Sequence, residues 1–248
     1  DGLRAALDGS PEAMAGEVKA STLLGRGGAG FPAGVKWGFT PQGVWPRYLV
    51  VNGDESEPGT YKDRLLMERD PHQLIEASLI ACYAAGLSQC FLKVPGEMPL
   101  AHERIAPALN DAYDAGYVGK NILGTDFSVD IVLHWGAGAY VVGEETALIE
   151  SLEGERGMPR LKPPFVPAAV GLYGQPTIVN NVETLANLPF IAANGSAAYT
   201  AIGTETSPGT RMIAISGHVK RPGVYEIING STTFRDIIYA DEFCQGIR

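Results

Sequence analysis

The run from Gly25 to Phe39, G-R-G-G-A-G-F-P-A-G-V-K-W-G-F, constrains this chain more than any other feature. Four glycines fall within the six residues from Gly25 to Gly30, and glycine adopts positive φ at little steric cost. Such a loop turns successive backbone N–H groups inward and forms a concave nest for an anion such as a phosphate. Arg26 and Lys36 add positive charge, and we expect them to flank the nest as mobile cations.

Flat apolar side chains accompany the same run, namely Phe31, Trp37 and Phe39. Glycines, cations and aromatics together favour a ligand with a phosphate and a flat ring, such as a nucleotide or flavin mononucleotide (FMN). The run lacks the G-K-[S/T] ending of a P-loop and the G-x-G-x-x-G spacing of a dinucleotide turn. A glycine-rich loop alone is also typical of a flexible connection, so the other segments decide between the two interpretations.

Composition narrows the partners. The 248 residues carry a formal net charge of −9, which argues against a nucleic acid held on a basic face. The longest nearly uncharged apolar stretch, Ala77 to Gln89, is too short to span a bilayer, and no signal-peptide pattern heads the sequence. The cysteines Cys82, Cys90 and Cys244 form no disulfide framework, zinc site or iron–sulfur site, so we expect small core residues in a reducing compartment.

Strand and helix signals alternate through the first three quarters of the chain. Apolar runs predict strands over 48–51, 90–94 and 129–133, and caps with helical periodicity predict helices over 11–20, 70–86, 98–115, 144–152 and 180–194. This order predicts an α/β fold with a parallel sheet covered by helices. Such sheets bind ligands beyond the carboxyl ends of their strands.

The last quarter has a different character. Residues 154–175 are rich in Pro and Gly and read as irregular, and residues 195–208 read as a linker. Beyond it, 211–219 and 224–227 predict two strands joined by a turn at Pro222–Gly223, and 233–239 predicts a short helix. This segment reads as the beginning of a small α+β module.

Polar residues cluster where two of the predicted strands end. The turn N-G-D-E-S-E-P-G, from Asn52 to Gly59, suits a hard cation, or hydrogen bonds from sugar or ribityl hydroxyls, or plain solvation. The second turn, W-G-A-G-A-Y-V-V-G-E-E-T, lets a ligand approach closely at its glycines, and its two glutamates are also ordinary first-turn acids.

Asparagine and threonine mark the last predicted helix start. Asn180, Asn181 and Thr184 either cap their own helix or bind a further partner. None of the histidines, His72, His102, His134 and His218, falls in these loops. Hydrolytic acid–base chemistry therefore has little support, whereas hydride or electron transfer needs only a well-placed cofactor.

Four motifs in the same order resemble a known family over nearly the whole chain. They are G-R-G-G-A-G-F-P-A-G-V-K-W, V-N-G-D-E-S-E-P-G-T-Y-K-D-R, G-A-G-A-Y-V-V-G-E-E-T-A-L-I-E-S-L-E-G and P-T-I-V-N-N-V-E-T-L. Together they resemble the flavin-bearing, NADH-oxidising subunit of respiratory complex I (NuoF). Diaphorase subunits of NAD-reducing hydrogenases and NAD-dependent formate dehydrogenases share these motifs.

The resemblance implies a Rossmann-like parallel-sheet domain that binds FMN and NADH over residues 1–202. It implies the start of a β-grasp-like (SLBB) domain over residues 203–248, while the family's helical [4Fe–4S] domain and its cysteine ligands are absent from this chain. It also implies a set of FMN-binding residues: Gly25, Arg26, Gly27, Gly28, Lys36, Asn52, Asp54, Glu55, Ser56, Tyr140, Gly143, Glu144, Asn180, Asn181 and Thr184. NADH would stack near Phe31, Phe39 and Phe165, with Lys162 and the two functional glutamates, Glu57 and Glu145, beside it.

The implied activity is hydride transfer from NADH to FMN, followed by single electrons to iron–sulfur clusters and quinone. A diaphorase subunit and a non-catalytic flavin-binding module are the alternatives. The implied partners are a thioredoxin-like [2Fe–2S] subunit and a large iron–sulfur subunit, at the cytoplasmic face of a bacterial inner membrane or on the mitochondrial matrix side. Two departures stand out: Val142 replaces a common Cys, and Val166 adds one residue to the P-P-F-P-A loop.

Overall fold

The computed structural model describes residues 1–163 and 166–248. Its centre is a four-stranded parallel sheet of order β3–β2–β1–β4. The strands are β1 (Tyr48–Asn52), β2 (Gln89–Pro95), β3 (Asp130–Gly136) and β4 (Thr177–Asn181). This confirms the predicted α/β fold with a parallel sheet.

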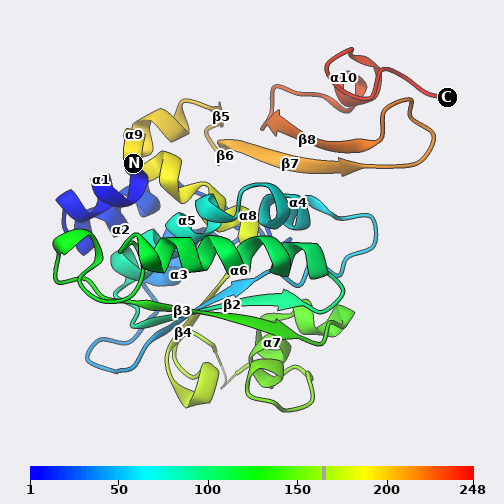
Figure 1. Cartoon of the computed structure of the whole chain (residues 1–248). Helices are drawn as coiled ribbons and strands as arrows, with labels where there is room; N and C mark the ends of the chain where they lie inside the picture. Colours follow the sequence, from blue (N-terminus) through cyan, green and yellow to red (C-terminus); the bar gives the residue numbers. More distant parts are fainter. Residues whose placement is uncertain (164–165) are drawn as a thin grey trace.

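Helices cover both faces of the sheet (Figure 1). One layer contains α5 (Pro71–Ala85) and α6 (Pro99–Asp114), and the other face carries α7 (Glu145–Leu152). Strand β1 shows why two layers are needed. Leu49 and Val51 belong to the larger apolar cluster with α5 and α6, whereas Val50 belongs to a second cluster with α7. Successive strand residues point to opposite faces, so both faces of an apolar strand must be covered.

Local signals set the predicted helix ends. In α2 (Pro11–Ala20), the Ser10 hydroxyl accepts the Ala13 N–H, and in α5 the Asp70 carboxylate accepts the Gln73 N–H at 3.1 Å. Helix α5 ends at Gly86, which is left-handed with φ 61°, as a C-terminal cap requires. Shorter helices complete the layer beside α5: α1 (Gly2–Asp8), α3 (Ala33–Trp37) and α4 (Lys62–Arg69).

The prediction of one helix over 180–194 is wrong. Asn180 and Asn181 end strand β4, and the helical part divides into α8 (Val182–Ala186) and α9 (Leu188–Thr200). The run T-I-V-N lies beside β1 with all four residues buried, and that tertiary pairing outweighs local helical signals. The expected linker over 195–208 is also wrong in part. Helix α9 continues to Thr200, and the short pair β5 (Gly203–Thr204) and β6 (Ser207–Pro208) follows.

The segment from residue 203 onward, here called the C-terminal module, forms the predicted antiparallel strand pair and helix. These are β7 (Thr210–Ile215), β8 (Gly223–Ile228) and α10 (Phe234–Tyr239). Val219, Ile227, Ile237 and Cys244 are its small apolar core. Figure 1 shows the module as an outlying unit beyond α9, and β7 contacts α4.

All three cysteines are free and buried, as expected for core residues. Within the described parts of the chain, no helix has the length and apolar character needed to cross a membrane.

Candidate functional site

The glycine loop, residues Gly25–Phe31, is a narrow turn closed at its base. Gly25 N–H donates to the Phe31 carbonyl and Ala33 N–H donates to the Leu23 carbonyl, both at 2.9 Å. Gly28 and Gly30 take φ values of 120° and 67°, which explains why glycine is required there. From Gly27 to Phe31, the backbone N–H groups donate to no group of the described residues. The expected nest is therefore present, with its donors free to bind an anion.

Two adjoining cavities, of about 480 and 720 Å³, form a continuous cleft beside this loop. They share Gly27, Asn52, Gly143, Glu144 and Asn181. Asn52 and Asn181 end strands β1 and β4, so the cleft lies at the carboxyl edge of the sheet, where the topology predicts a ligand. Its volume is in the range of small-molecule and cofactor sites.

Most residues implied by the resemblance line this cleft. The smaller cavity adds Gly25, Phe31, Lys36, Phe39, Glu145, Lys162, Asn180 and Thr184, and the larger adds Arg26, Gly28, Glu55, Ser56, Glu57 and Tyr140. The Phe31 and Phe39 rings, 5.9 Å apart and about half exposed, form an apolar wall. Trp37 is buried, and its indole N–H donates to the Asn180 side chain. Phe165 lies outside the described residues.

Two lysines and two glutamates form an ion-pair cluster in the smaller cavity. Lys36 Nζ lies 2.9 Å from Glu145, and Lys162 Nζ lies 2.6 Å from Glu144 and 3.0 Å from Glu145. Burial works to raise the pKa of Glu145, but the two lysines outweigh it and hold the pKa below its ordinary value. Burial also opposes ionisation of Glu144, and Lys162 together with bonds within α7 outweighs it and lowers the pKa. Both acids are thus held ionised.

The Asp54 carboxylate does not line the cleft. It is fully buried, paired with Lys93 of β2 and bonded by the Ser56 hydroxyl. Its implied role as a direct contact to the cofactor is therefore revised: Asp54 fixes the turn from which Ser56 and Glu57 reach the cleft. Lys93 was missed at the sequence level, because a lysine inside an apolar strand has no local signal; the aspartate two residues after Asn52 was the only hint of a partner.

Glu55 and Asn181 hold helix starts as well as lining the cleft. The Glu55 carboxylate accepts the N–H groups of Asp63 and Arg64 at 2.7 Å each. Burial, followed by the nearby Asp63, raises its pKa. The Asn181 side chain accepts from Glu183 N–H and Thr184 N–H. For Asn181 the capping interpretation is therefore confirmed, while Asn180 lines the cleft.

Tyr140 closes one wall of the larger cavity. Its hydroxyl donates to Glu57 at 2.6 Å, and this bond raises the tyrosine pKa. The contact joins the two strand-end turns whose polar residues stand far apart in the sequence. Nearby, Asn52 donates to the Gly143 carbonyl at 2.9 Å, so the turns are linked at two points.

The expectation that Arg26 is a mobile cation is wrong. Arg26 is only 7% exposed, and its Nη2 group donates to the carbonyls of Pro208 and Thr210 in the C-terminal module. Its backbone N–H donates to Thr184 Oγ1 at 2.8 Å. The Arg26 side chain therefore reaches away from the nest, and the positive charge nearest the anion site comes from the loop N–H groups and Lys36.

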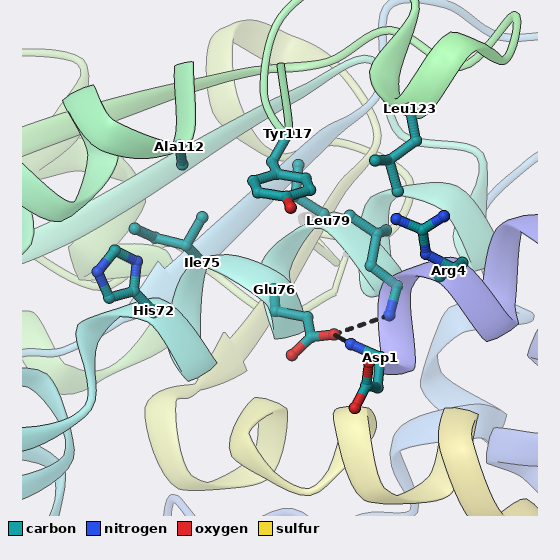
Figure 2. Close-up of a pocket in the computed structure, with 10 residues that line it drawn as sticks. Asp1, Arg4, His72, Ile75, Glu76, Leu79, Ala112, Tyr117 and Leu123 are labelled. Atoms are coloured by element: carbon teal, nitrogen blue, oxygen red, sulfur yellow. Dashed lines mark hydrogen bonds and ion pairs between the residues drawn. The ribbon is translucent and has the colours of Figure 1, made fainter. Parts of the chain in front are cut away.

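A further cavity, of about 270 Å³, lies apart from the cleft (Figure 2). Ile75, Leu79 and Leu123 give it an apolar wall, and Glu76 at its rim accepts the N–H groups of Asp1 and Leu3 at the start of α1. It shares no residue with the cleft and gathers no phosphate-binding or catalytic set. Across 1–163 and 166–248, no cluster of three potential metal ligands occurs.

The fold and the cleft define a class: an α/β domain that binds a phosphorylated, ring-bearing cofactor at the carboxyl edge of its sheet. Similarity to known proteins narrows that class. The family model described as the Nuo51 FMN-binding domain matches residues 18–190. This chain belongs to that family, and its cofactor is FMN.

Curated relatives agree with this assignment. The F-type subunit of the NADH-quinone oxidoreductase of Aquifex aeolicus (strain VF5) is 52% identical over 237 residues, covering 96% of this chain and 55% of the relative. The protein of the same name from Streptomyces coelicolor is 52% identical over 233 residues, covering 94% and 52%. The chain thus spans about half the length of the curated relatives it matches.

A solved structure has the same fold. A chain from the crystal structure of an NAD⁺-reducing [NiFe]-hydrogenase in the air-oxidized state superimposes with a TM-score of 0.79 at 39% identity. The match covers 96% of this chain and 39% of the other.

Proposed function

We propose that this chain is the NADH-oxidising, FMN-bearing part of an NADH–quinone oxidoreductase. The observation that carries the proposal is the continuous cleft, in which a nest of N–H donors, an aromatic pair and a Lys–Glu cluster meet at the carboxyl edge of the sheet. When bound, FMN accepts a hydride from NADH and releases the electrons singly. The remaining steps follow from what the protein residues do.

The glycine loop, with Lys36, supplies the phosphate end of the proposed FMN site. Asn52, Ser56 and Asn180 line its polar side. Gly143 packs against buried Asp54, where a Cβ would lie 3.7 Å from the carboxylate, so the backbone of this turn is free to approach a ring. These residues fit FMN because they combine free N–H donors, polar acceptors and a close backbone approach.

The aromatic wall supplies the proposed nicotinamide side. Phe31 and Phe39 are exposed to the smaller cavity and offer apolar faces for stacking. Glu57, Glu145 and Lys162 surround this space with charges that are already fixed by partners. No protein acid or base is required, because orienting the two rings accelerates hydride transfer.

Related names favour two assemblies. The curated relatives favour a respiratory NADH–quinone oxidoreductase, with a thioredoxin-like [2Fe–2S] subunit and a large iron–sulfur subunit as partners at a membrane face. The hydrogenase match supports the second candidate, a diaphorase subunit. In either assembly we assign residues 1–202 to cofactor binding and 203–248 to part of a β-grasp-like domain, with iron–sulfur ligands supplied elsewhere.

An anaerobic flavin titration tests the proposal. The chain is mixed with FMN, and the flavin absorbance is recorded before and after addition of NADH. Bound flavin that is bleached by NADH, and less readily by NADPH, supports the assignment. Bound flavin that NADH cannot bleach contradicts the oxidoreductase function and favours a non-catalytic flavin-binding module.

A further inference from the structure

Arg26 connects the glycine loop to two separate parts of the molecule. Its backbone N–H donates to Thr184 at the start of α8. Its guanidinium Nη2 donates to the Thr210 carbonyl at 2.9 Å and to the Pro208 carbonyl at 3.2 Å. A single residue inside the loop is thus held at its backbone by the cofactor domain and at its tip by the strand pair beyond α9.

The receiving corner, Pro208–Thr210, is itself fixed. Gly209 has φ 77°, and a Cβ there would lie 2.2 Å from the Tyr199 hydroxyl. Its N–H donates to the Ile202 carbonyl at 2.7 Å. From the end of β8, Asn229 donates its side-chain amide to the Pro208 carbonyl at 3.2 Å. The two carbonyls that hold Arg26 therefore have a defined direction set by the C-terminal module.

Other bonds hold the module to the cofactor domain without touching the loop. Met212 N–H donates to Glu183 at 2.8 Å, and the Tyr61 hydroxyl donates to the Ile215 carbonyl at 2.8 Å. The Glu183 carboxylate is also paired with Lys62 at 2.8 Å. Docking of the module therefore rests on several contacts, of which the Arg26 contact is the one that enters the glycine loop.

The Arg26 guanidinium depends strongly on these carbonyls. Its Nε and Nη1 groups are buried and have no partner among the described residues. Apart from a 3.4 Å contact to the Tyr199 hydroxyl, the two carbonyls provide its hydrogen bonds. A buried charged donor left without partners is strongly unfavourable. Displacing the corner would therefore release Arg26 and, with it, one end of a loop whose own N–H groups are unbonded.

We propose that Arg26 is a positioning residue through which the C-terminal module sets the shape of the glycine loop, and thereby the retention of FMN. This inference rests on the proposed FMN site. The module then acts on cofactor affinity from outside the cleft. Because coupling between two binding equilibria is reciprocal, FMN must also strengthen docking of the module.

Substitutions on both sides of the contact test the inference in the full chain. Arg26→Met keeps the buried stem and removes the donors, and Asn229→Ala frees the Pro208 carbonyl from inside the module. Each is expected to raise the Kd for FMN by about 5- to 150-fold, the usual range of such coupling. The matched control is Asp236→Asn, which weakens the cap of α10 within the same module but lies outside the docking contacts. Its Kd for FMN is expected to stay within about twofold of the unmodified chain, since it leaves the coupling contacts in place.

Hydrogen exchange supplies a readout that a general loss of stability would not reproduce. Saturating FMN is expected to slow exchange at Met212 N–H in the unmodified chain and to have little effect there in Arg26→Met. FMN affinity within twofold of the unmodified chain in both test variants overturns the inference, and so does an equal loss in Asp236→Asn. An unmodified chain that binds no FMN overturns the proposed function as well, so the two failures are distinguishable.

Discussion

Lys93→Met is the substitution whose effect follows most directly from the structure. The Lys93 and Asp54 side chains are both 0% exposed and form an ion pair between β2 and the turn after β1. Methionine keeps the length and apolar stem of lysine but removes the charge, which leaves the Asp54 carboxylate with the Ser56 hydroxyl as its remaining side-chain donor. Removing one partner of a buried pair costs about 3–5 kcal/mol. For a chain of this size, that corresponds to a fall in Tm of roughly 6–20 °C.

Urea unfolding of Lys93→Met, Asp54→Asn and the double variant measures this energy. If the pair acts as a unit, the double variant loses less free energy of unfolding than the sum of the single losses, by about 0.5–3 kcal/mol. Lys120→Met is the control, because Lys120 is exposed, and its effect is expected within about 0.5 kcal/mol. A loss below about 1 kcal/mol in Lys93→Met, or strictly additive losses, would refute the reasoning.

Three further substitutions test other parts of the structure. Glu57→Gln is expected to change kcat/KM for NADH while FMN stays bound, since Glu57 lines the larger cavity and accepts from Tyr140; lost flavin with unchanged NADH affinity would contradict the assignment. The lysines hold the pKa of Glu145 below its ordinary value of 4.5, so its stabilisation is present above about pH 4.5 and is lost as the pH falls through the depressed folded-state pKa. The urea midpoint of the unmodified chain is therefore expected to fall more between about pH 5 and pH 3 than that of Glu145→Gln, and parallel curves would exclude this contribution. Gly86→Ala places a side chain at φ 61° and is expected to lower the free energy of unfolding by about 1–2 kcal/mol, which thermal melting measures; an unchanged Tm would contradict it.

Much of the sheet could be predicted because its signals are local. Strand β1 is a short apolar run, and α5 has Asp70 and Pro71 at its start and Gly86 at its end. Strand β4 could not be predicted in this way. Its last two residues, Asn180 and Asn181, are poor strand formers and read as caps, and only pairing with β1 makes them part of the sheet.

The cleft was predictable in position and less so in the duties of its residues. Glycines and aromatics identified the loop because their roles follow from backbone freedom and shape. Polar residues such as Asp54 and Arg26 were misassigned because a charge has the same local signal whether it binds a ligand or a buried partner far along the chain. Lys93 lies 39 residues from Asp54 in sequence, and no periodicity links the two.

The charged groups of the cleft also indicate how an anion is recognised. Lys36 and Lys162 are each paired with a glutamate, and Lys62 is paired with Asp63. An arriving phosphate must therefore share these lysines with carboxylates that already neutralise them. The N–H groups of Gly27 to Phe31, in contrast, have no competing acceptor among the described residues. Phosphate binding then depends more on the shape of this loop than on nearby charge, which is why a residue that fixes the loop from behind has more influence on affinity than its distance from the ligand suggests.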